Sequence, residues 1–132
     1  MPITGIFLEP AKEDRKDQVL NYHIDFDQRV DDLTGQPIGR PVLTTFTIVI
    51  RRDSEPEADF YINWQLDPTL KENLDICFYN NNQLKRSIKI EDAYLVSYNQ
   101  DLKTPGVIEE SLTLSPYRVQ IDGVTFDRKD YQ

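Results

Sequence analysis

Apolar and polar residues alternate along residues 19–30, and this alternation constrains the fold more than any other feature of the chain. In VLNYHIDFDQRV, polar residues separate four apolar ones: Leu20, Tyr22, Ile24 and Phe26. A period of two is typical of a β-strand with one face on the core and the other in water. Residues 42–52, VLTTFTIVIRR, alternate in the same way and are rich in β-branched residues. We therefore expect two long strands.

The stretch DDLTGQPIGRP, residues 31–41, separates these two strands and is long and polar for a small domain. It holds two aspartates, two glycines and two prolines. Glycine and proline allow an extended, stiff segment that belongs to neither helix nor sheet. The sequence therefore predicts an extended inter-strand loop over residues 31–41.

The rest of the chain is dominated by shorter apolar runs that predict further strands. These runs cover residues 3–8, 74–79, 84–90, 93–98, 108–115, 117–121 and 124–126. Hairpin turns are expected at Asn80-Asn81-Asn82 and Asp122-Gly123, since Asn, Asp and Gly tolerate left-handed conformations. Residues 11–18 and 101–106 are predicted loops. The run 93–98, AYLVSY, alternates little, so we expect it to be covered on both faces.

One short helix is predicted between the third strand and the fourth. Ser54 or Asp53 is a suitable cap, and Pro56 suits the first turn. The helix is expected to end near Asp67-Pro68. Two aromatic residues four positions apart share one face of this helix, Phe60 and Trp64.

About eight antiparallel strands in so few residues favour a closed arrangement, because open strand edges invite unwanted pairing. The expected fold is mainly β, a small antiparallel β-barrel with one short α-helix packed on its outside through Phe60 and Trp64. All 132 residues are expected to form a single domain. Within it, 1–18 is an N-terminal segment and 31–41 is the extended inter-strand loop.

Composition excludes several classes of protein. The formal net charge of −8 would repel a phosphate backbone, so nucleic acid is not an expected partner. Cys77 is the only cysteine, so no internal disulfide forms. The N-terminus lacks the pattern of a secretory signal, and no apolar run is long enough to span a bilayer. A soluble chain made in the cytoplasm is expected.

Candidate groups for chemistry are few. His23 is the only histidine and lies on the polar face of a predicted strand, where a solvated side chain is expected rather than a general base. Cys77, between Ile76 and Phe78, is expected to be a buried, inert thiol. Trp64, Phe60 and Tyr61 could stack on a ligand, but a helical aromatic pair covering the core is the favoured interpretation.

Paired acids are the remaining candidates. They stand at Asp25/Asp27, Asp31/Asp32, Glu91/Asp92 and Glu109/Glu110. Asp25 and Asp27 share a strand face and could hold a hard cation or flank a sugar, although a solvated acidic face is the simpler interpretation. DDLTG is similar to the opening of a calcium loop but lacks the alternating ligands and the closing glutamate. No zinc spacing or phosphate-binding loop is present. We expect no catalytic residue, metal or cofactor.

Four segments in order along the chain resemble those of a known family. They are DDLTGQP (31–37), FYINWQLDP (60–68), EDAYLVSYNQ (91–100) and SLTLSPYRVQIDG (111–123). This arrangement resembles the tube-forming protein of the type VI secretion system, Hcp or TssD, in the form found in Bacteroidetes, which is related to contractile phage tail tube proteins. The resemblance extends from about Val19 to the end of the chain.

The resemblance implies a structural subunit and not an enzyme. Six copies would form a ring, and stacked rings would form a hollow tube that contraction of a sheath expels with its spike, carrying effectors. The subunit would be cytoplasmic before firing and secreted without a signal peptide. The partners implied are other copies of the chain, sheath, spike and baseplate proteins, and secreted effectors.

The resemblance also implies roles for particular residues. In related proteins a loop between early strands reaches the adjacent ring. The matching ring-stacking positions here are Asp31, Asp32, Leu33, Thr34, Gly35, Gln36, Pro37 and Arg40, and Arg40 could pair with acids on the next subunit. Polar groups at Asn21, His23, Asp25 and Asp27 would suit the wall of a wet channel. A floppy hairpin loop is the simpler alternative for residues 31–41.

Other functions remain open from the sequence. A tube subunit of a phage-tail-like extracellular contractile injection particle would have a similar sequence. A monomeric β-barrel with a ligand in its mouth would show the mass of one subunit and a concave apolar pocket. A hydrolase using Asp25 and Asp27 would place a cleft around these acids and lose activity on Asp→Asn substitution.

Overall fold

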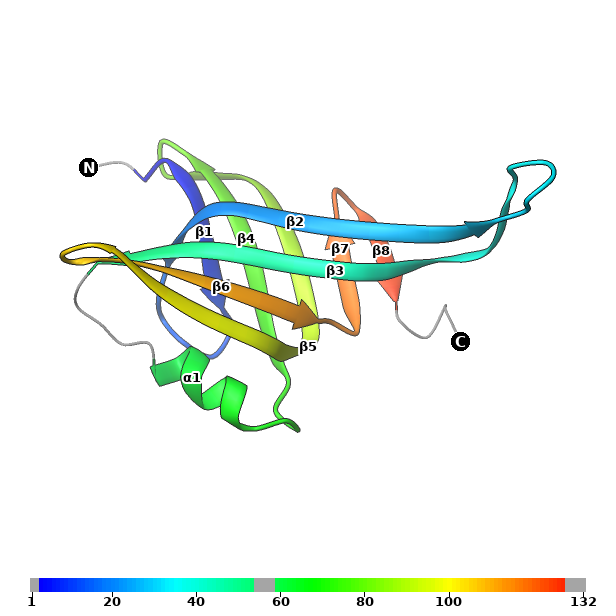
Figure 1. Ribbon diagram of the computed structural model, residues 1–132. Helices are drawn as coiled ribbons and strands as arrows, with labels where there is room; N and C mark the ends of the chain where they lie inside the picture. Colours follow the sequence, from blue (N-terminus) through cyan, green and yellow to red (C-terminus); the bar gives the residue numbers. More distant parts are fainter. Residues whose placement is uncertain (1–2, 54–58, 128–132) are drawn as a thin grey trace.

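The computed structural model describes residues 3–53 and 59–127, and within these ranges it contains eight strands and one helix. The long central strands run across the molecule, and a hairpin projects from one end (Figure 1). In chain order the elements are β1 (Gly5–Pro10), β2 (Asp17–Val30), β3 (Pro37–Asp53), α1 (Asp59–Leu66), β4 (Glu72–Asn80), β5 (Gln83–Thr104), β6 (Val107–Ser115), β7 (Arg118–Ile121) and β8 (Val124–Asp127).

The strands form one antiparallel sheet that closes partly into a barrel. Their order is β4-β1-β2-β3-β6-β5-β7-β8, and an additional pairing of β4 with β5 joins the sheet to itself. β7 and β8 continue outward from β5 as a short hairpin. The predicted class is therefore confirmed: a mainly β, antiparallel barrel with one short helix. Closure removes most open edges, which explains how so small a domain keeps its sheet from pairing with others.

The core lies between the barrel wall and α1. Alternate residues of the central strands point into it, with Phe46, Ile48 and Ile50 of β3 all fully buried. The helix contributes Tyr61 and Trp64 to this core. The other buried apolar members of this cluster are Leu8, Val19, Leu74, Ile76, Ile88, Ile90, Ala93, Leu95, Leu112, Leu114 and Val119.

The predicted loop over residues 31–41 is wrong in its second half, because residues 37–41 belong to β3. β2 and β3 continue past the barrel as a two-stranded ribbon that ends with Val30 opposite Pro37. A bulge near Gly39, whose φ is +83°, absorbs the extra residues of β3 between its pairs with Asp27 and Arg29. Pro37 is the first residue of β3, a position where proline is tolerated although it has no N–H group to donate.

Of the residues predicted at the helix start, Asp53 is the last residue of β3, and the described helix α1 spans Asp59–Leu66. Ser54 and Pro56, the other residues predicted at this start, lie outside the described residues. The predicted end near Asp67 is confirmed, since α1 ends at Leu66. Trp64 is 1% exposed and donates from its Nε1 to the Leu70 carbonyl at 3.1 Å.

Segments 84–90 and 93–98, predicted as two strands, are parts of the single strand β5. Its first half pairs with β4 and β7, and its second half pairs with β6. Asp92, with a φ of +50°, marks the change of partner. β5 continues to Thr104, so the predicted loop at 101–106 reduces to a tight turn before Val107. Val96 is 55% exposed, so the prediction that 93–98 is covered on both faces is wrong for the isolated chain.

The two predicted hairpin turns are confirmed, with left-handed residues at Asn81-Asn82 and Asp122-Gly123. The predicted inner face of β2 is only partly correct. Tyr22 and Ile24 pack against the core, whereas Leu20 is exposed and Val19 is buried in its place. Leu20 is the extra residue of a bulge, since Val19 pairs with Ile50 and Asn21 with Val49. A bulge places two residues opposite one and so breaks the period of two.

Candidate functional site

The hairpin tip, residues 31–36, is a closed turn with its own hydrogen bonds. The Asp31 N–H donates to the Gln36 carbonyl at 2.9 Å, and the Gly35 N–H donates to the Asp31 carbonyl at 2.8 Å. The Asp31 Oδ1 accepts the N–H groups of Leu33 at 2.9 Å and Thr34 at 3.1 Å. An aspartate that binds the backbone two and three residues ahead fixes a turn. The tip therefore has a defined shape.

The tip presents an apolar side chain directly after two acids. Leu33 is 95% exposed, the largest value among the exposed apolar side chains of the described residues, and Asp32 beside it is also exposed. The N–H groups of Thr34 and then Leu33 lower the pKa of Asp31, so this carboxyl stays ionised at neutral pH. Gly35 has a φ of +73°, which glycine adopts without strain. The Arg40 side chain lies outside the described part of the chain.

Exposed apolar residues follow the ribbon back to the barrel. Phe26, Val30, Ile38 and Val42 are each at least 40% exposed. At the base of the ribbon, Phe26 packs edge-on against Phe126 of β8 with ring centroids 4.5 Å apart. An open groove of about 420 Å³ lies next to this pair, lined mainly by residues 42–46, 113–116, Val96 and Phe126. Exposed apolar side chains of this size, gathered in one region of a small chain, are typical of an interaction site.

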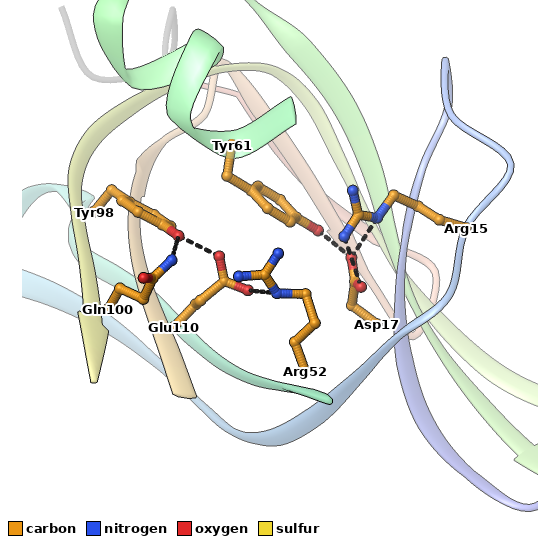
Figure 2. Close-up of polar contacts among 7 residues, drawn as sticks. All are labelled: Arg15, Asp17, Arg52, Tyr61, Tyr98, Gln100 and Glu110. Carbon is orange, nitrogen blue, oxygen red and sulfur yellow. Dashed lines mark hydrogen bonds and ion pairs between the residues drawn. The ribbon is translucent and has the colours of Figure 1, made fainter. Parts of the chain in front are cut away.

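A buried polar network lies beneath α1 and holds the helix on the barrel (Figure 2). The Tyr61 hydroxyl donates to Asp17 Oδ2 at 2.6 Å, and the Arg15 guanidinium binds the same carboxylate from Nε at 2.9 Å and Nη2 at 3.0 Å. Burial, and then the Asp17 charge, raise the pKa of Tyr61 well above its usual value. The tyrosine therefore remains a neutral hydrogen-bond donor.

A second part of the network is centred on Glu110, which is fully buried on β6. Its carboxylate forms an ion pair with Arg52 Nε at 2.9 Å and accepts the Tyr98 hydroxyl. Gln100 donates from Nε2 to the Tyr98 oxygen at 2.9 Å. Burial, and then the Glu110 carboxylate, raise the pKa of Tyr98 to about 12. A buried carboxylate with these partners stiffens the barrel, and nothing in this arrangement activates a nucleophile.

The sequence does not reveal this network. Asp17 and Arg15 stand in a charged segment predicted to be a loop, and Glu110 is one of a pair that suggests a solvated acidic face. The signal that could have found Glu110 is its position in the alternation of IEESLTLS, on the same face as Leu112 and Leu114.

The predicted chemical candidates do not form a common site, and only His23 and Asp25 are in contact. His23 is exposed and its Nε2 lies 2.9 Å from Asp25 Oδ2, so the imidazole and this carboxylate interact in solvent. Asp25 and Asp27 lie on the exposed part of β2, and neither lines the cavities described for residues 3–53 and 59–127. Cys77 is buried, as predicted, and burial raises the pKa of its thiol to about 12. A thiol with so high a pKa is a poor nucleophile.

The other acid pairs have separate environments. Asp31 caps the tip turn while Asp32 is exposed, and Glu91 forms an ion pair with Arg118 at 3.2 Å while Asp92 occupies the bend in β5. Across the described ranges, no three or more His, Cys, Asp or Glu side chains gather so that they could hold a metal ion. No helix in the same part of the chain is long and apolar enough to cross a membrane.

The fold is that of several solved structures. Hcp1 from Flavobacterium johnsoniae is similar over 93% of this chain and 98% of its own, with a TM-score of 0.76 and 20% sequence identity. Hcp1 from Salmonella typhimurium matches over 96% of each chain, with a TM-score of 0.64 and 15% identity. A PVC sheath-tube complex of an extracellular contractile injection system matches over 96% of this chain and 91% of its own, with a TM-score of 0.51 and 17% identity.

These likenesses define the class as an Hcp-like barrel. The model of the family described as hemolysin coregulated protein Hcp (TssD) matches residues 6–129. The chain therefore belongs to the Hcp (TssD) family, whose members are tube proteins of type VI secretion. No curated protein is significantly similar to it in sequence.

Proposed function

We propose that the chain is the structural subunit of a type VI secretion inner tube, in which six copies form a ring and the rings stack. Membership of the Hcp (TssD) family supports this function. The observation that carries the proposal is the projecting β2–β3 ribbon with its defined tip and a Leu33 side chain that is 95% exposed. An exposed apolar knob on a stiff arm suits insertion into another molecule better than solvent.

Ring formation requires complementary patches on opposite flanks of the subunit. A head-to-tail contact whose rotation closes makes a ring, and one that does not close makes a filament. The groove between Val42, Val96 and Phe126 offers an apolar patch on one flank. The open edge of β2, which beyond Gln18 pairs with β3 alone among the described strands, offers backbone hydrogen bonds on another. These surfaces supply side-by-side contacts separate from those of the ribbon tip.

The further partners follow from this function. Sheath, spike and baseplate proteins would contact the assembled tube, and secreted effectors would ride in its lumen. The polar residues Asn21, His23, Asp25 and Asp27 suit a wet wall. The subunit would be cytoplasmic before firing and leave through the apparatus itself. The likeness to the PVC sheath-tube complex favours one second candidate, the tube subunit of an extracellular contractile injection particle.

Assembly can be tested by size-exclusion chromatography with light scattering and by electron microscopy. We expect a mass close to six times 15.5 kDa and ring-shaped particles that stack at high concentration. A monomer at every concentration would contradict the proposal and would favour a single-subunit binding module.

A shortened variant separates the ring from the stack. Residues 28–41 are replaced by Asn-Gly, which joins the paired residues Asp27 and Val42 through a two-residue hairpin turn. We expect this variant to fold and form rings but no long tubes. A matched control replaces Asn81-Asn82, in the turn between β4 and β5, with Asn-Gly and leaves the ribbon intact. Long tubes from the shortened variant would show that the ribbon does not stack rings.

A further inference from the structure

A pocket at the opposite end of the molecule from the ribbon tip is lined by cations. It has a volume of about 360 Å³ at the place where β1 and β2 pair, and its lining residues are Phe7, Lys16, Asp17, Gln18, Arg51 and Arg52. β1 pairs with β2 only at residues 17–18, so the two strands diverge beside it.

The charges of this pocket differ from those of the chain as a whole, whose formal charge is −8. Its one acid, Asp17, is held by Arg15 and Tyr61. Arg52 is an inner residue that binds Glu110. Lys16 and Arg51 are exposed at the mouth of the pocket.

Acids also lie next to these two cations. The Lys16 Nζ lies 3.0 Å from Glu9 Oε1 and donates to the Tyr79 hydroxyl at 3.1 Å. Arg51 stands opposite Glu109 in the β3–β6 register. An incoming carboxylate can still join these groups, because an ammonium group has three N–H donors and a guanidinium group has five.

The ribbon tip has the complementary composition. Residues 31–36 carry two acids and no cation, with Leu33 projecting between them and the turn glycine. The pocket offers the matching groups, an apolar ring in Phe7 and cations in Lys16 and Arg51. Opposite charges around an apolar centre give both orientation and contact area in a protein interface.

The two surfaces are at opposite ends of one β2–β3 ladder. Gln18 pairs with Arg51 at the pocket, and Val30 pairs with Pro37 at the base of the tip. Twelve residues of strand separate them, which at roughly 3.3 Å per residue is about 40 Å. Figure 1 shows the start of β2 and the tip on opposite sides of the molecule. The tip therefore cannot reach the pocket of its own chain.

We propose that the pocket of Phe7, Lys16 and Arg51 receives the Asp31–Leu33 tip of a second copy in the next ring. This inference rests on the proposed stacking function and names its acceptor. Leu33 packs against Phe7, and the two carboxylates lie near Lys16 and Arg51. Each copy has one tip and one pocket, so every ring can bind a further ring through the same contact. A heterologous interface along a tube requires this.

Cross-linking tests this contact directly. Chains carrying both Asp32→Cys and Arg51→Cys are assembled and treated with a short bismaleimide. We expect a ladder of dimers, trimers and longer species on denaturing gels, because the two positions are too far apart to link within a chain. The matched control combines Asp32→Cys with Asn63→Cys, on the exposed face of α1, and shares the buried Cys77. It is expected to give at least tenfold less ladder.

Charge exchange gives a second, independent measurement. Asp32→Lys or Arg51→Glu alone is expected to raise the concentration needed for tube formation by about tenfold, because each brings like charges together. The double variant is expected to return to within about threefold of the unaltered chain, which a mere loss of folding would not do. Circular dichroism verifies that each variant is folded.

The outcomes separate this inference from the function on which it rests. Tubes that form normally but give no ladder above the control, with no rescue by the double variant, would overturn the acceptor pocket and leave the tube function intact. An unaltered chain that forms neither rings nor tubes would overturn both.

Discussion

The barrel and the ribbon are built from the same two strands but are stabilised differently. In the barrel, β3 has neighbours on both sides, its inner residues are fully buried, and charged groups such as Glu110 are held in a closed network. In the ribbon, β3 pairs with β2 alone, and its apolar residues are exposed. The barrel buries its core within one chain, whereas the ribbon carries exposed apolar side chains of the kind that interaction surfaces use.

This difference shows that one strand can contribute buried residues to folding along one part of its length and exposed residues to assembly along the other. Substitutions in the barrel should change the free energy of unfolding, and substitutions in the ribbon should change association and leave folding unaffected. Four measurements test the contrast, from the largest expected effect to the smallest.

Trp64→Ala should give the largest effect on folding. It removes a side chain that is 1% exposed and a hydrogen bond to the Leu70 carbonyl, so we expect a loss of about 3–5 kcal/mol in urea unfolding. Leu33→Ala at the tip is the matched control and should change unfolding by less than about 0.5 kcal/mol. Similar losses in both variants would remove the contrast between the two regions.

Glu110→Gln should be next in size. The amide keeps the volume but removes the negative charge that faces Arg52 and Tyr98, and we expect about 2 kcal/mol of destabilisation. Glu109→Gln, one residue earlier and on the opposite strand face, is the control and should cost less than about 1 kcal/mol. Thermal unfolding of both variants at neutral pH measures the difference. An equal cost would mean that the network does not stabilise the barrel.

Phe26→Ala tests the junction of the two regions. Its ring packs edge-on against Phe126, so we expect a loss of about 1 kcal/mol and faster hydrogen exchange at the Phe126 amide. Val30→Ala, four residues further along the exposed ribbon, is the comparison and should leave the exchange rate of the Phe126 amide unchanged. An equal hydrogen-exchange rate at the Phe126 amide in both variants would show that the ribbon does not stabilise β8.

The smallest effect concerns the pH dependence of the tip. Backbone N–H groups lower the pKa of Asp31, so its support of the turn is present above the ordinary aspartate pKa of about 3.9 and is lost as pH falls through the lower folded value. The NMR shifts of the Leu33 and Thr34 amides should therefore titrate below pH of about 3.9. In Asp31→Asn these shifts should be independent of pH. A midpoint above 3.9 would contradict the proposed capping role.

The alternation of apolar residues predicts most of the fold. It identifies β2 and β3, and the apolar runs and turn residues identify the later hairpins correctly. It fails where the backbone departs from a regular period, at the Leu20 bulge and at the Asp92 bend, since a single extra or left-handed residue leaves no mark in composition. The ribbon extends through Pro37 to Pro41 because bulges accommodate residues that usually end a strand.

The candidate site is predicted less completely than the fold. The tip residues Asp31 to Gln36 are readable from the sequence as a turn, but their hydrogen bonds and the exposure of Leu33 depend on the position of the turn beyond the barrel. The cationic pocket depends on Phe7 of β1, Lys16 of the loop before β2 and Arg51 of β3. A pairing pattern, and not a motif, brings them together.

The uncovered edge of β2 also matters before any assembly forms. A row of free N–H and C=O groups can pair with any extended segment, including the wrong one. His23, Asp25 and Asp27, on the exposed face of β2, place hydrophilic and mostly negative side chains next to this edge. If the β2 edge of a second copy paired with it, the aspartates of the two strands would repel one another. Asp25 and Asp27 are therefore expected to disfavour the pairing of one β2 edge with another before a tube forms.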